Sequence, residues 1–314
     1  MEKIDISVIM PALNVENYIA EAIESILSQS GINFELIIIN DGSKDSTQKI
    51  IDNYIKRYSN IKCIKQNNNG LSHARKEGLN IARGKYICFC DADDILEKNA
   101  LRFMKEKFEL FKLDCLVVNA RFKNELNNSF GFKNNGKKII SKLHDNEVKT
   151  GEEFLEAMIN NYEWRYAVWL YFTTKQKIID SGISFFKNII HEDAPYNYQL
   201  LNSCKKVKFI DKIIYNYRLR SDSLMSLLPN IRDVKGYVNA LYTIFNYNEL
   251  NFPGDYNKYK FEIRMLDQLI EVYQQLSMLE QKKCSKEINK VSKILEQRNF
   301  YNNINYKNLF DEVR

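Results

Sequence analysis

The chain has 314 residues, of which 45% are hydrophobic, and this length allows one large domain or two modest ones. Only 4 prolines and 11 glycines exclude a low-complexity chain, and no stretch approaches the roughly 20 apolar residues that cross a bilayer. The net charge of +6 suits a phosphate-bearing ligand or an anionic membrane face, although a solvated lysine-rich surface is the simpler explanation. No nucleic-acid-binding motif accompanies the charge, so we expect no nucleic-acid partner.

The cysteines and the N-terminus both favour a cytoplasmic protein. The 6 cysteines show no Cys-x-x-Cys spacing, and Cys88 and Cys90 face the same side of a predicted strand. They therefore suit small buried hydrophobes in a reducing compartment better than metal ligands. The 3 histidines are too few and too scattered for a histidine-rich metal site. The first residues carry acids within an apolar run that leads directly into a strand, so we expect no signal peptide.

Strands and helices alternate through the first part of the chain. Apolar runs predict strands at residues 5–10, 34–39, 61–64, 85–90 and 113–118. Helical spacing of apolar residues predicts helices at residues 16–28, 46–58, 72–82 and 101–111, with Ser72 capping the third. This alternation indicates an α/β fold with a mostly parallel, Rossmann-like sheet that is covered by helices on both faces.

The pattern changes beyond residue 118. We expect loops or a hairpin at residues 119–149, a helix that starts at Thr150, and two strands around a turn at Asp211-Lys212. From about residue 231, apolar spacing predicts three helices, with a break at residues 252–255. The chain is thus expected to form an α/β domain over residues 1–228, with halves of about 1–118 and 119–228, and a helical C-terminal region over residues 229–314. The apolar helix faces suit packing on their own domain, a homodimer, or peripheral contact with the inner membrane face.

The most informative motif is Asp91-Ala92-Asp93-Asp94, which directly follows a predicted strand. Three carboxylates then crowd the carboxyl end of a strand, where an open α/β sheet binds its ligands. Carboxylates this close repel one another unless a cation or hydrogen-bond donors lie between them. A divalent metal that binds these carboxylates together with a phosphate is the simplest explanation for such a cluster. Asp94 also fits a helix N-cap, with Glu97 as its capping-box partner, but a cap explains only one of the three acids.

Two further loops are expected at the same sheet edge. They are Pro11-Ala12-Leu13-Asn14, after the first strand, and Asn40-Asp41-Gly42-Ser43, after the second. Because parallel strands have their carboxyl ends at one edge, the three loops should converge on one crevice. The chain has no Gly-x-Gly-x-x-Gly loop after the first strand and no Walker loop. A grip on phosphate must therefore come mainly from a metal and side chains.

Together with Gly70-Leu-Ser-His-Ala-Arg75 and Gly84-Lys-Tyr-Ile-Cys-Phe, these loops resemble the family 2 glycosyltransferases, which are inverting enzymes of the GT-A fold. The resemblance runs in order over residues 5–112 and resumes weakly over residues 169–225. It implies transfer of one hexosyl or N-acetylhexosaminyl group from a nucleotide sugar, most often a UDP-sugar, to a glycan or lipid-linked saccharide. Surface polysaccharide or glycoconjugate synthesis is the implied setting. The resemblance is to bacterial-type members of the family. The lack of an obvious Gln-x-x-Arg-Trp segment and of spanning helices argues against a processive polymerase, so we expect a non-processive enzyme.

The resemblance implies roles for residues of the first two loops and of the helix after them. Asp41 would hydrogen-bond the nucleotide base, in a pocket that Pro11 and Asn14 shape. Arg75 would lie near the nucleotide and brace these loops. Lys76 stands where many members of the family have asparagine, which puts the local hydrogen bonding in doubt but not the fold.

The same resemblance separates the roles of the acids. Asp91, with Ala92 next to it, would hold the ribose or support the metal. Asp93 would ligate the Mn²⁺ or Mg²⁺ ion that bridges the donor diphosphate. Arg220 lies in an aromatic and basic segment at residues 215–223 and would meet the diphosphate, because a guanidinium suits phosphate geometry. A surface hairpin with solvated arginines is the alternative for that segment.

The resemblance places the catalytic base at Asp193, with Glu192 as the neighbour that positions it or the acceptor. Without the upstream motifs, a helix N-cap would be the better interpretation of this pair. Trp164 and Trp169 suit either the acceptor pocket or the core. An inactive binding scaffold and a nucleotidyltransferase are the two alternatives from other functional classes. Intact acids argue against an inactive nucleotide-sugar-binding scaffold, and the missing Gly-x-x-Thr-Arg loop argues against a sugar-phosphate nucleotidyltransferase.

Overall fold

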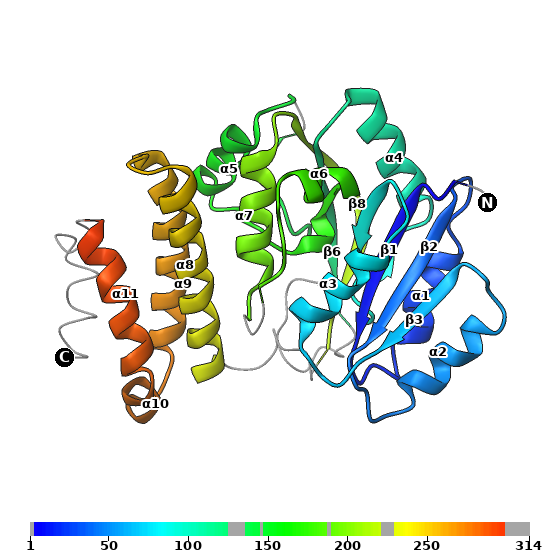
Figure 1. Ribbon diagram of the computed structural model, residues 1–314, viewed down its shortest axis with the longest axis horizontal. Helices are drawn as coiled ribbons and strands as arrows, with labels where there is room; N and C mark the ends of the chain where they lie inside the picture. Colours follow the sequence, from blue (N-terminus) through cyan, green and yellow to red (C-terminus); the bar gives the residue numbers. More distant parts are fainter. Residues whose placement is uncertain (1–2, 125–135, 145–146, 187–189, 221–228, 299–314) are drawn as a thin grey trace. The chain divides into compact units, whose positions relative to one another are not determined.

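The computed structural model describes residues 3–124, 136–144, 147–186, 190–220 and 229–298 (Figure 1). The chain forms two compact units. Unit 1 holds Met1–Lys187 and Tyr196–Ser226, and unit 2 holds Asn188–Pro195 and Leu227–Arg314. A short segment from the middle of the sequence therefore groups with the C-terminal helices.

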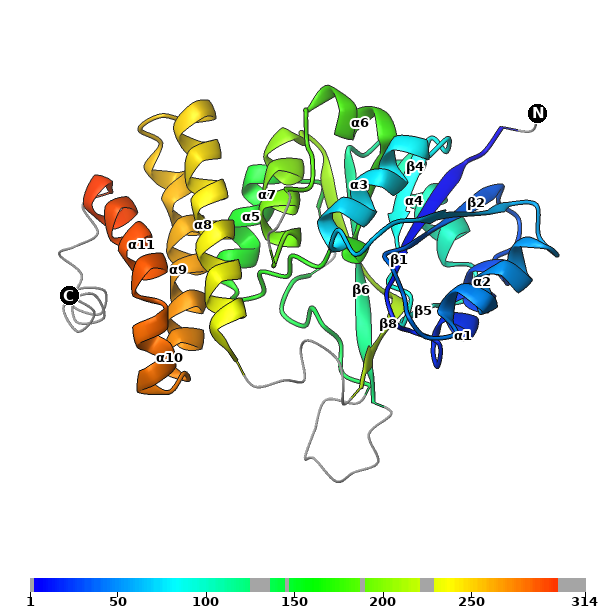
Figure 2. The ribbon, with the colours of Figure 1, turned by 60° about the horizontal axis from the view of Figure 1, so that its bottom comes forward.

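The first half of unit 1 is a parallel sheet built from alternating strands and helices. Its strands are β1 (Ile6–Ala12), β2 (Phe34–Asn40), β3 (Ile61–Lys65) and β4 (Tyr86–Phe89). Its helices are α1 (Ile19–Leu27), α2 (Thr47–Ile55) and α3 (Leu71–Ile81). β1 pairs in parallel with both β2 and β4, and β2 pairs in parallel with β3. Since crossovers between parallel strands are right-handed, α3 lies on the face opposite to α1 and α2 (Figure 2).

The second half of unit 1 extends the same sheet with mixed pairing. Its strands are β5 (Ile95–Leu96), β6 (Cys115–Asn124), β7 (Tyr171–Thr174) and β8 (Val207–Leu219). Its helical elements are α4 (Ala100–Phe111), α5 (Gly151–Asn160), η1 (Val168–Leu170), α6 (Lys175–Asp180) and α7 (Asp193–Ser203), whose first turn belongs to unit 2. The strand order is β3-β2-β1-β4-β7-β6-β8-β5. The predicted α/β fold with helices on both faces is confirmed.

The predictions for β8 and for the start of α3 are wrong. The sequence suggested two strands around Asp211-Lys212, but β8 is one strand of 13 residues that passes through this exposed pair. Its partner β6 absorbs the irregularity by register shifts between Val118 and Ala120. The helix expected to be capped by Ser72 instead begins at Leu71 with Gly70 at its N-cap, because only glycine takes the φ of 87° there without strain. The helix expected from Thr150 is confirmed as α5, with Thr150 at its N-cap and a capping box with Glu153.

Unit 2 is mainly a set of helices that pack along their apolar faces. They are α8 (Ile231–Asn251), η2 (Tyr256–Lys258), α9 (Tyr259–Gln274), α10 (Met278–Lys283) and α11 (Ser285–Gln297). α8, α9 and α11 lie side by side in Figures 1 and 2. The residues expected on their apolar faces, such as Leu241, Leu269 and Ile288, are buried. α8 ends at the predicted break, whereas the short helix α10 was not predicted. Across the described ranges, no helix is long and apolar enough to traverse a membrane.

Candidate active site

The loops that follow β1 and β2 are joined by hydrogen bonds at the carboxyl edge of the sheet. The side-chain carbonyl of Asn14 accepts from the backbone N–H of Lys44 at 2.9 Å. The Glu16 N–H donates to the Asp45 carboxylate at 3.0 Å, and the Glu16 carboxylate accepts from the Ser46 N–H at 2.8 Å. Asn14 has a φ of 52°, a left-handed conformation that asparagine adopts more readily than most residues. The two loops therefore form one continuous rim.

Asp41 fixes a third segment to this rim. Its backbone N–H donates to the Ala12 carbonyl at 2.9 Å. Its carboxylate accepts from the Gln66 side chain at 2.6 Å and from the backbone N–H groups of Asn69 and Gly70 at 2.7 and 2.9 Å. The side chain thus anchors the loop between β3 and α3 at the point where α3 begins. A contact between Asp41 and a nucleotide base stays a prediction.

Arg75 reaches from α3 to the acidic loop, Asp91–Asp94. Its side chain is only 1% exposed, and its Nη2 atom lies 3.0 Å from Oδ1 of Asp91. The guanidinium carbon also lies 5.7 Å from the ring centre of Phe185. A buried guanidinium needs such a carboxylate partner, because an unpaired charge is costly inside a protein. Arg75 therefore connects α3 to the first acid of the loop.

Asp94 is the most deeply buried acid of the loop, with no exposed surface. Its carboxylate accepts from the Tyr215 hydroxyl at 2.7 Å and from the Arg218 backbone N–H at 2.8 Å. The Tyr215 hydroxyl in turn accepts from the Asp91 backbone N–H at 3.0 Å. Burial, with the neighbouring charges of Asp93 and Asp91, raises the pKa of Asp94 well above its ordinary value. Asp94 therefore attaches the acidic loop to β8.

The prediction that Asp94 caps the following helix is wrong. α4 begins at Ala100, and Asn99 holds the N-cap position in a left-handed conformation with a φ of 60°. β5 separates Asp94 from that helix. Glu97, which was expected to complete a capping box, instead accepts from the Arg121 guanidinium at 2.5 Å. Asp94 and Glu97 have the spacing of a capping box, but each instead contacts residues far away in the sequence.

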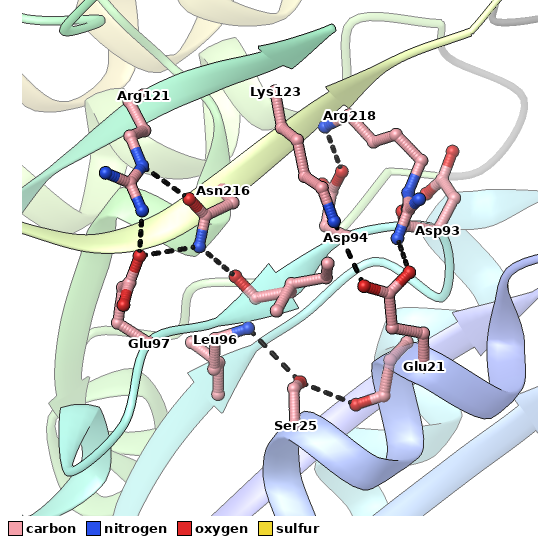
Figure 3. A network of polar contacts seen from close by, with 12 residues as sticks. Glu21, Ser25, Asp93, Asp94, Leu96, Glu97, Arg121, Lys123, Asn216 and Arg218 are labelled. Carbon is pink, nitrogen blue, oxygen red and sulfur yellow. Dashed lines mark hydrogen bonds and ion pairs between the residues drawn. The ribbon is translucent and has the colours of Figure 1, made fainter. Parts of the chain in front are cut away.

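Arg218 joins β8 to both the acidic loop and α1, as Figure 3 shows. Its Nε donates to the Asp93 carbonyl at 2.6 Å, and its Nη2 lies 2.5 Å from Oε2 of Glu21. Glu21 also accepts from the Lys123 ammonium group at 3.0 Å. The Arg218 guanidinium carbon lies 5.2 Å from the ring centre of Tyr18. Because Arg218 is buried, it is not the solvated surface arginine that a hairpin would present.

Asp93 faces a different arginine. Its carboxylate accepts from Nε of Arg220 at 2.8 Å, with 21% of the Asp93 side chain and 16% of the Arg220 side chain exposed. Burial, with the Asp91 charge, raises the pKa of Asp93, although Arg220 acts against this shift. The structure thus brings together Asp91, Asp93 and Arg220, as expected for one site.

Sequence reasoning missed the residues that hold the acidic loop in place. Tyr215, Arg218 and Glu21 form the support, and the hydrogen bonds from Tyr215 and Arg218 to Asp94 span 121 and 124 residues of sequence. The one available signal was Arg218, a charged residue that directly follows Tyr215-Asn216-Tyr217 near the end of β8. A buried arginine in such a strand predicts a carboxylate partner but does not say which one.

The predicted catalytic base, Asp193, and its neighbour Glu192 lie in unit 2. Glu192 is buried, and Asp193 is the first residue of α7. Trp164 and Trp169 are buried in unit 1, and Trp169 stacks on Tyr215 with a ring-centre distance of 4.3 Å. Both indoles therefore take the core role rather than line an open acceptor pocket.

A family model described as "Glycosyl transferase family 2" matches residues 7–171, which include the rim and the acidic loop. The chain belongs to glycosyltransferase family 2. It is similar to the uncharacterised glycosyltransferase EpsJ of Bacillus subtilis, at 32% identity over 225 residues, which cover 71% of this chain and 63% of EpsJ. It is also similar to glycosyltransferase GlyA of Streptococcus pneumoniae, at 32% identity over 70% of this chain and 31% of GlyA. The chain thus spans less than two thirds of these relatives.

Solved structures show that the family 2 chain has the GT-A fold. S. aureus TarS 1–349 in complex with UDP-GlcNAc matches 92% of this chain and 82% of its own, with a TM-score of 0.69 and 20% identity. The mannosyltransferase PcManGT of Pyrobaculum calidifontis, in complex with GDP-Man and Mn²⁺, matches 100% of this chain and 85% of its own, with a TM-score of 0.58 and 11% identity. The predicted family and fold are confirmed.

Proposed function

We propose that this chain is an inverting, non-processive glycosyltransferase that moves one hexosyl or N-acetylhexosaminyl group from a UDP-sugar to a glycan or lipid-linked saccharide. Membership of family 2 supports sugar transfer. A relative named for minor teichoic acid biosynthesis supports a role in surface polysaccharide or glycoconjugate synthesis. The complex of TarS with UDP-GlcNAc supports a UDP donor. The observation that carries the proposal is the acidic loop, fixed on several sides with the Asp93 carboxylate paired to Arg220.

The rim loops suit the nucleoside half of a donor. In this proposal, Asp41 reaches the base in a pocket shaped by Pro11 and Asn14, while Asp91, with Ala92 next to it, holds the ribose. The hydrogen bonds that anchor Asp41 and the ion pair of Asp91 with Arg75 support these roles, because a prearranged site loses less entropy when it binds.

The surroundings of Asp93 fit a Mn²⁺ or Mg²⁺ ion. Arg220 already places a positive charge against its carboxylate, and burial beside Asp91 makes further positive charge favourable there. Within the described residues, no group of three or more histidine, cysteine or acidic side chains could hold a metal by itself. Mg²⁺ commonly binds through one or two carboxylates plus substrate phosphates, so Asp93 would hold the ion together with the donor. When bound, such an ion supplies Lewis-acid stabilisation of the departing diphosphate.

Asp193 would act as the general base, with Glu192 positioning it or the acceptor. Its carboxylate takes the proton from the acceptor hydroxyl while that oxygen forms a bond to C1 of the sugar. The bond between C1 and the diphosphate breaks, and its electron pair leaves with the phosphate oxygen. Arg220 would meet this developing negative charge. A single displacement of this kind needs no protein nucleophile and inverts the configuration at C1.

A pair of variants separates the two acids. We expect Asp93→Ala to weaken UDP binding in Mn²⁺ by at least about tenfold, because the proposed metal ligand is lost. We expect Asp193→Ala to keep UDP binding but to lower UDP release from a UDP-sugar by about 10²–10⁴-fold, the usual contribution of a general base. Calorimetric titration measures the first effect, and a UDP-release assay measures the second.

Asp180→Ala, at the exposed end of α6, is the matched control and should resemble the wild type in both assays. Wild-type turnover by Asp193→Ala would show that the base assignment is wrong. Tight UDP binding by a wild-type protein that turns over no nucleotide sugar would instead favour the inactive scaffold.

A further inference from the structure

The C-terminal helices have no role in the proposed function, yet unit 2 contains the segment that carries Asp193. Residues Asn188–Pro195 group with these helices rather than with the chain on either side. Within this segment, Ile190 and His191 directly precede Glu192 and Asp193. The contacts between these residues and α8 therefore bear on how the proposed base is held.

Gly236 allows α8 to approach Ile190 and His191 unusually closely. A Cβ atom at Gly236 would lie 2.9 Å from Cβ and 3.0 Å from the carbonyl oxygen of Ile190, and 3.0 Å from Cδ2 of His191. Ordinary carbon–carbon contacts lie near 3.5–4.0 Å, so even an alanine requires the segment or the helix to shift. Glycine within a helix costs roughly 1 kcal/mol relative to alanine. The close approach gives a physical reason for glycine at this position.

Tyr237, the next residue of α8, contacts His191. The ring of Tyr237 stacks on the His191 imidazole, with ring centres 4.0 Å apart and planes inclined by 26°. His191 has a φ of 65°, in the left-handed region that non-glycine residues seldom adopt. A residue in this conformation persists only when its surroundings hold it there, and such residues cluster at functional sites. Tyr237 is one part of those surroundings.

His191, which α8 contacts, lies two residues before the proposed base, Asp193. The Ala194 N–H donates to the His191 carbonyl at 3.2 Å, so His191 and Asp193 belong to one tight turn at the start of α7. Holding Ile190 and His191 thereby restricts where the Asp193 carboxylate can lie. A general base must come within hydrogen-bond reach of the proton that it removes.

We infer that α8 braces the catalytic segment, with Gly236 and Tyr237 acting as positioning residues for Asp193. The inference rests on the proposed function, since Asp193 is the base only in that proposal. It gives the C-terminal helices a part in the reaction that requires neither dimerisation nor membrane contact. A misplacement of about 1 Å can cost about 10²-fold in rate, so small changes in this brace should be measurable.

Hydrogen exchange tests the brace without reference to activity. We expect Gly236→Ala and Tyr237→Leu to accelerate exchange of the His191–Ala194 amides by at least about tenfold, since each removes or displaces a contact that orders them. Tyr237→Phe keeps the stacked ring and should accelerate exchange less than Tyr237→Leu does. The amides of α9 report unit-wide opening in the same samples. Ile288→Val trims the core of unit 2 in α11 and should not act preferentially on the segment.

Turnover provides the second readout. Gly236→Ala and Tyr237→Leu should lower kcat for UDP release from UDP-GlcNAc by about 10- to 100-fold, with UDP affinity unchanged. Tyr237→Phe should lower kcat less than Tyr237→Leu does. Unchanged amide exchange at His191–Ala194 in both variants would overturn the brace. A loss of kcat that only tracks the loss of stability of unit 2 as a whole would also overturn it. Asp193→Asn is measured alongside. Wild-type turnover by Asp193→Asn would refute the proposed base but leave the exchange result standing, so the two failures are distinguishable.

Discussion

At the scale of single residues, Tyr215 contacts both Asp91 and Asp94 of the acidic loop, and also Trp169. Its hydroxyl donates to the buried Asp94 carboxylate and accepts from the Asp91 backbone, while its ring stacks on Trp169. One side chain thereby fixes both ends of the acidic loop that presents Asp93. The site depends on this residue even though it is not expected to touch the donor.

Tyr215→Phe removes only the hydroxyl. We expect it to lower the free energy of unfolding by about 1–3 kcal/mol, because the buried Asp94 carboxylate loses a hydrogen-bond donor. Urea unfolding measures this change. Tyr86→Phe is the matched control, since its hydroxyl donates at 2.8 Å to Glu109, whose side chain is 48% exposed and can be solvated instead. Equal losses in the two variants would contradict the special role of Tyr215.

The same residues show what the sequence could and could not predict. The acidic loop was placed correctly at a strand end because its signal is local: an apolar run followed by acids. The support of Asp94 was missed because Tyr215 and Arg218 are more than a hundred residues away, and no local pattern connects them. The spacing of Asp94 and Glu97 even suggested a cap. Local rules find the elements, whereas partners across the sheet depend on topology.

At the scale of elements, Glu35 on β2 connects several parts of the parallel sheet. Its carboxylate accepts from the Ser7 hydroxyl at 2.7 Å, the Lys62 ammonium at 2.9 Å and the Arg83 backbone N–H at 2.6 Å. Burial acts to raise the pKa of Glu35, but these hydrogen bonds outweigh it and hold the pKa below its ordinary value of 4.5. The ionised carboxylate therefore stabilises the folded protein above pH 4.5, and this contribution is lost as the pH falls through the lowered pKa.

Glu35→Gln should cost about 1.5–3 kcal/mol of unfolding free energy at pH 7, because it weakens hydrogen bonds to a buried charge. The deficit should shrink as the pH falls below 4.5, where the wild type loses the same stabilisation. Urea unfolding at several pH values measures both effects. Glu106→Gln disrupts only an exposed pair with Arg102 and should change stability by less than about 1 kcal/mol. A deficit that did not depend on pH would show that Glu35 acts through packing alone.

In unit 2, Arg298 joins the end of α11 to α8 and α9. Its guanidinium donates to Glu262 through two nitrogens at 2.9 Å each, and it also pairs with Glu249 on α8 at 2.5 Å. The guanidinium carbon lies 3.8 Å from the ring centre of Tyr259. Arg298 and Glu262 are both buried. This network explains how α11 is held to α8 and α9.

Arg298→Met should lower the free energy of unfolding by about 3–5 kcal/mol, because it leaves the Glu262 carboxylate buried without its main partner. Replacing both partners, as in Arg298→Met with Glu262→Leu, should recover much of that loss, since no unpaired charge remains. Thermal unfolding compares the two variants. A double variant less stable than the single one would contradict the account, because it would mean that packing by Glu262 outweighs its buried charge.

At the scale of the whole molecule, donor binding should stabilise the protein. A ligand present at 100 times its dissociation constant adds about 2.7 kcal/mol to the free energy of unfolding. For a domain of about 200 residues, this raises the melting temperature by roughly 5–10 °C. We expect UDP-sugars with Mn²⁺ to give the largest shift in a thermal screen of nucleotide sugars. Asp93→Ala should reduce that shift to about half or less, because its affinity is at least tenfold weaker. A shift of wild-type size in Asp93→Ala would place the metal elsewhere.

We propose that the chain transfers a sugar by one direct displacement, with a carboxylate base and no covalent sugar–enzyme intermediate. Proton NMR of the sugar released from an α-linked nucleotide sugar, with water in place of the acceptor, tests this mechanism, provided that spectra are taken before the free sugar mutarotates. We expect a β-configured product at the earliest times. A product that first appears in the α configuration would contradict it.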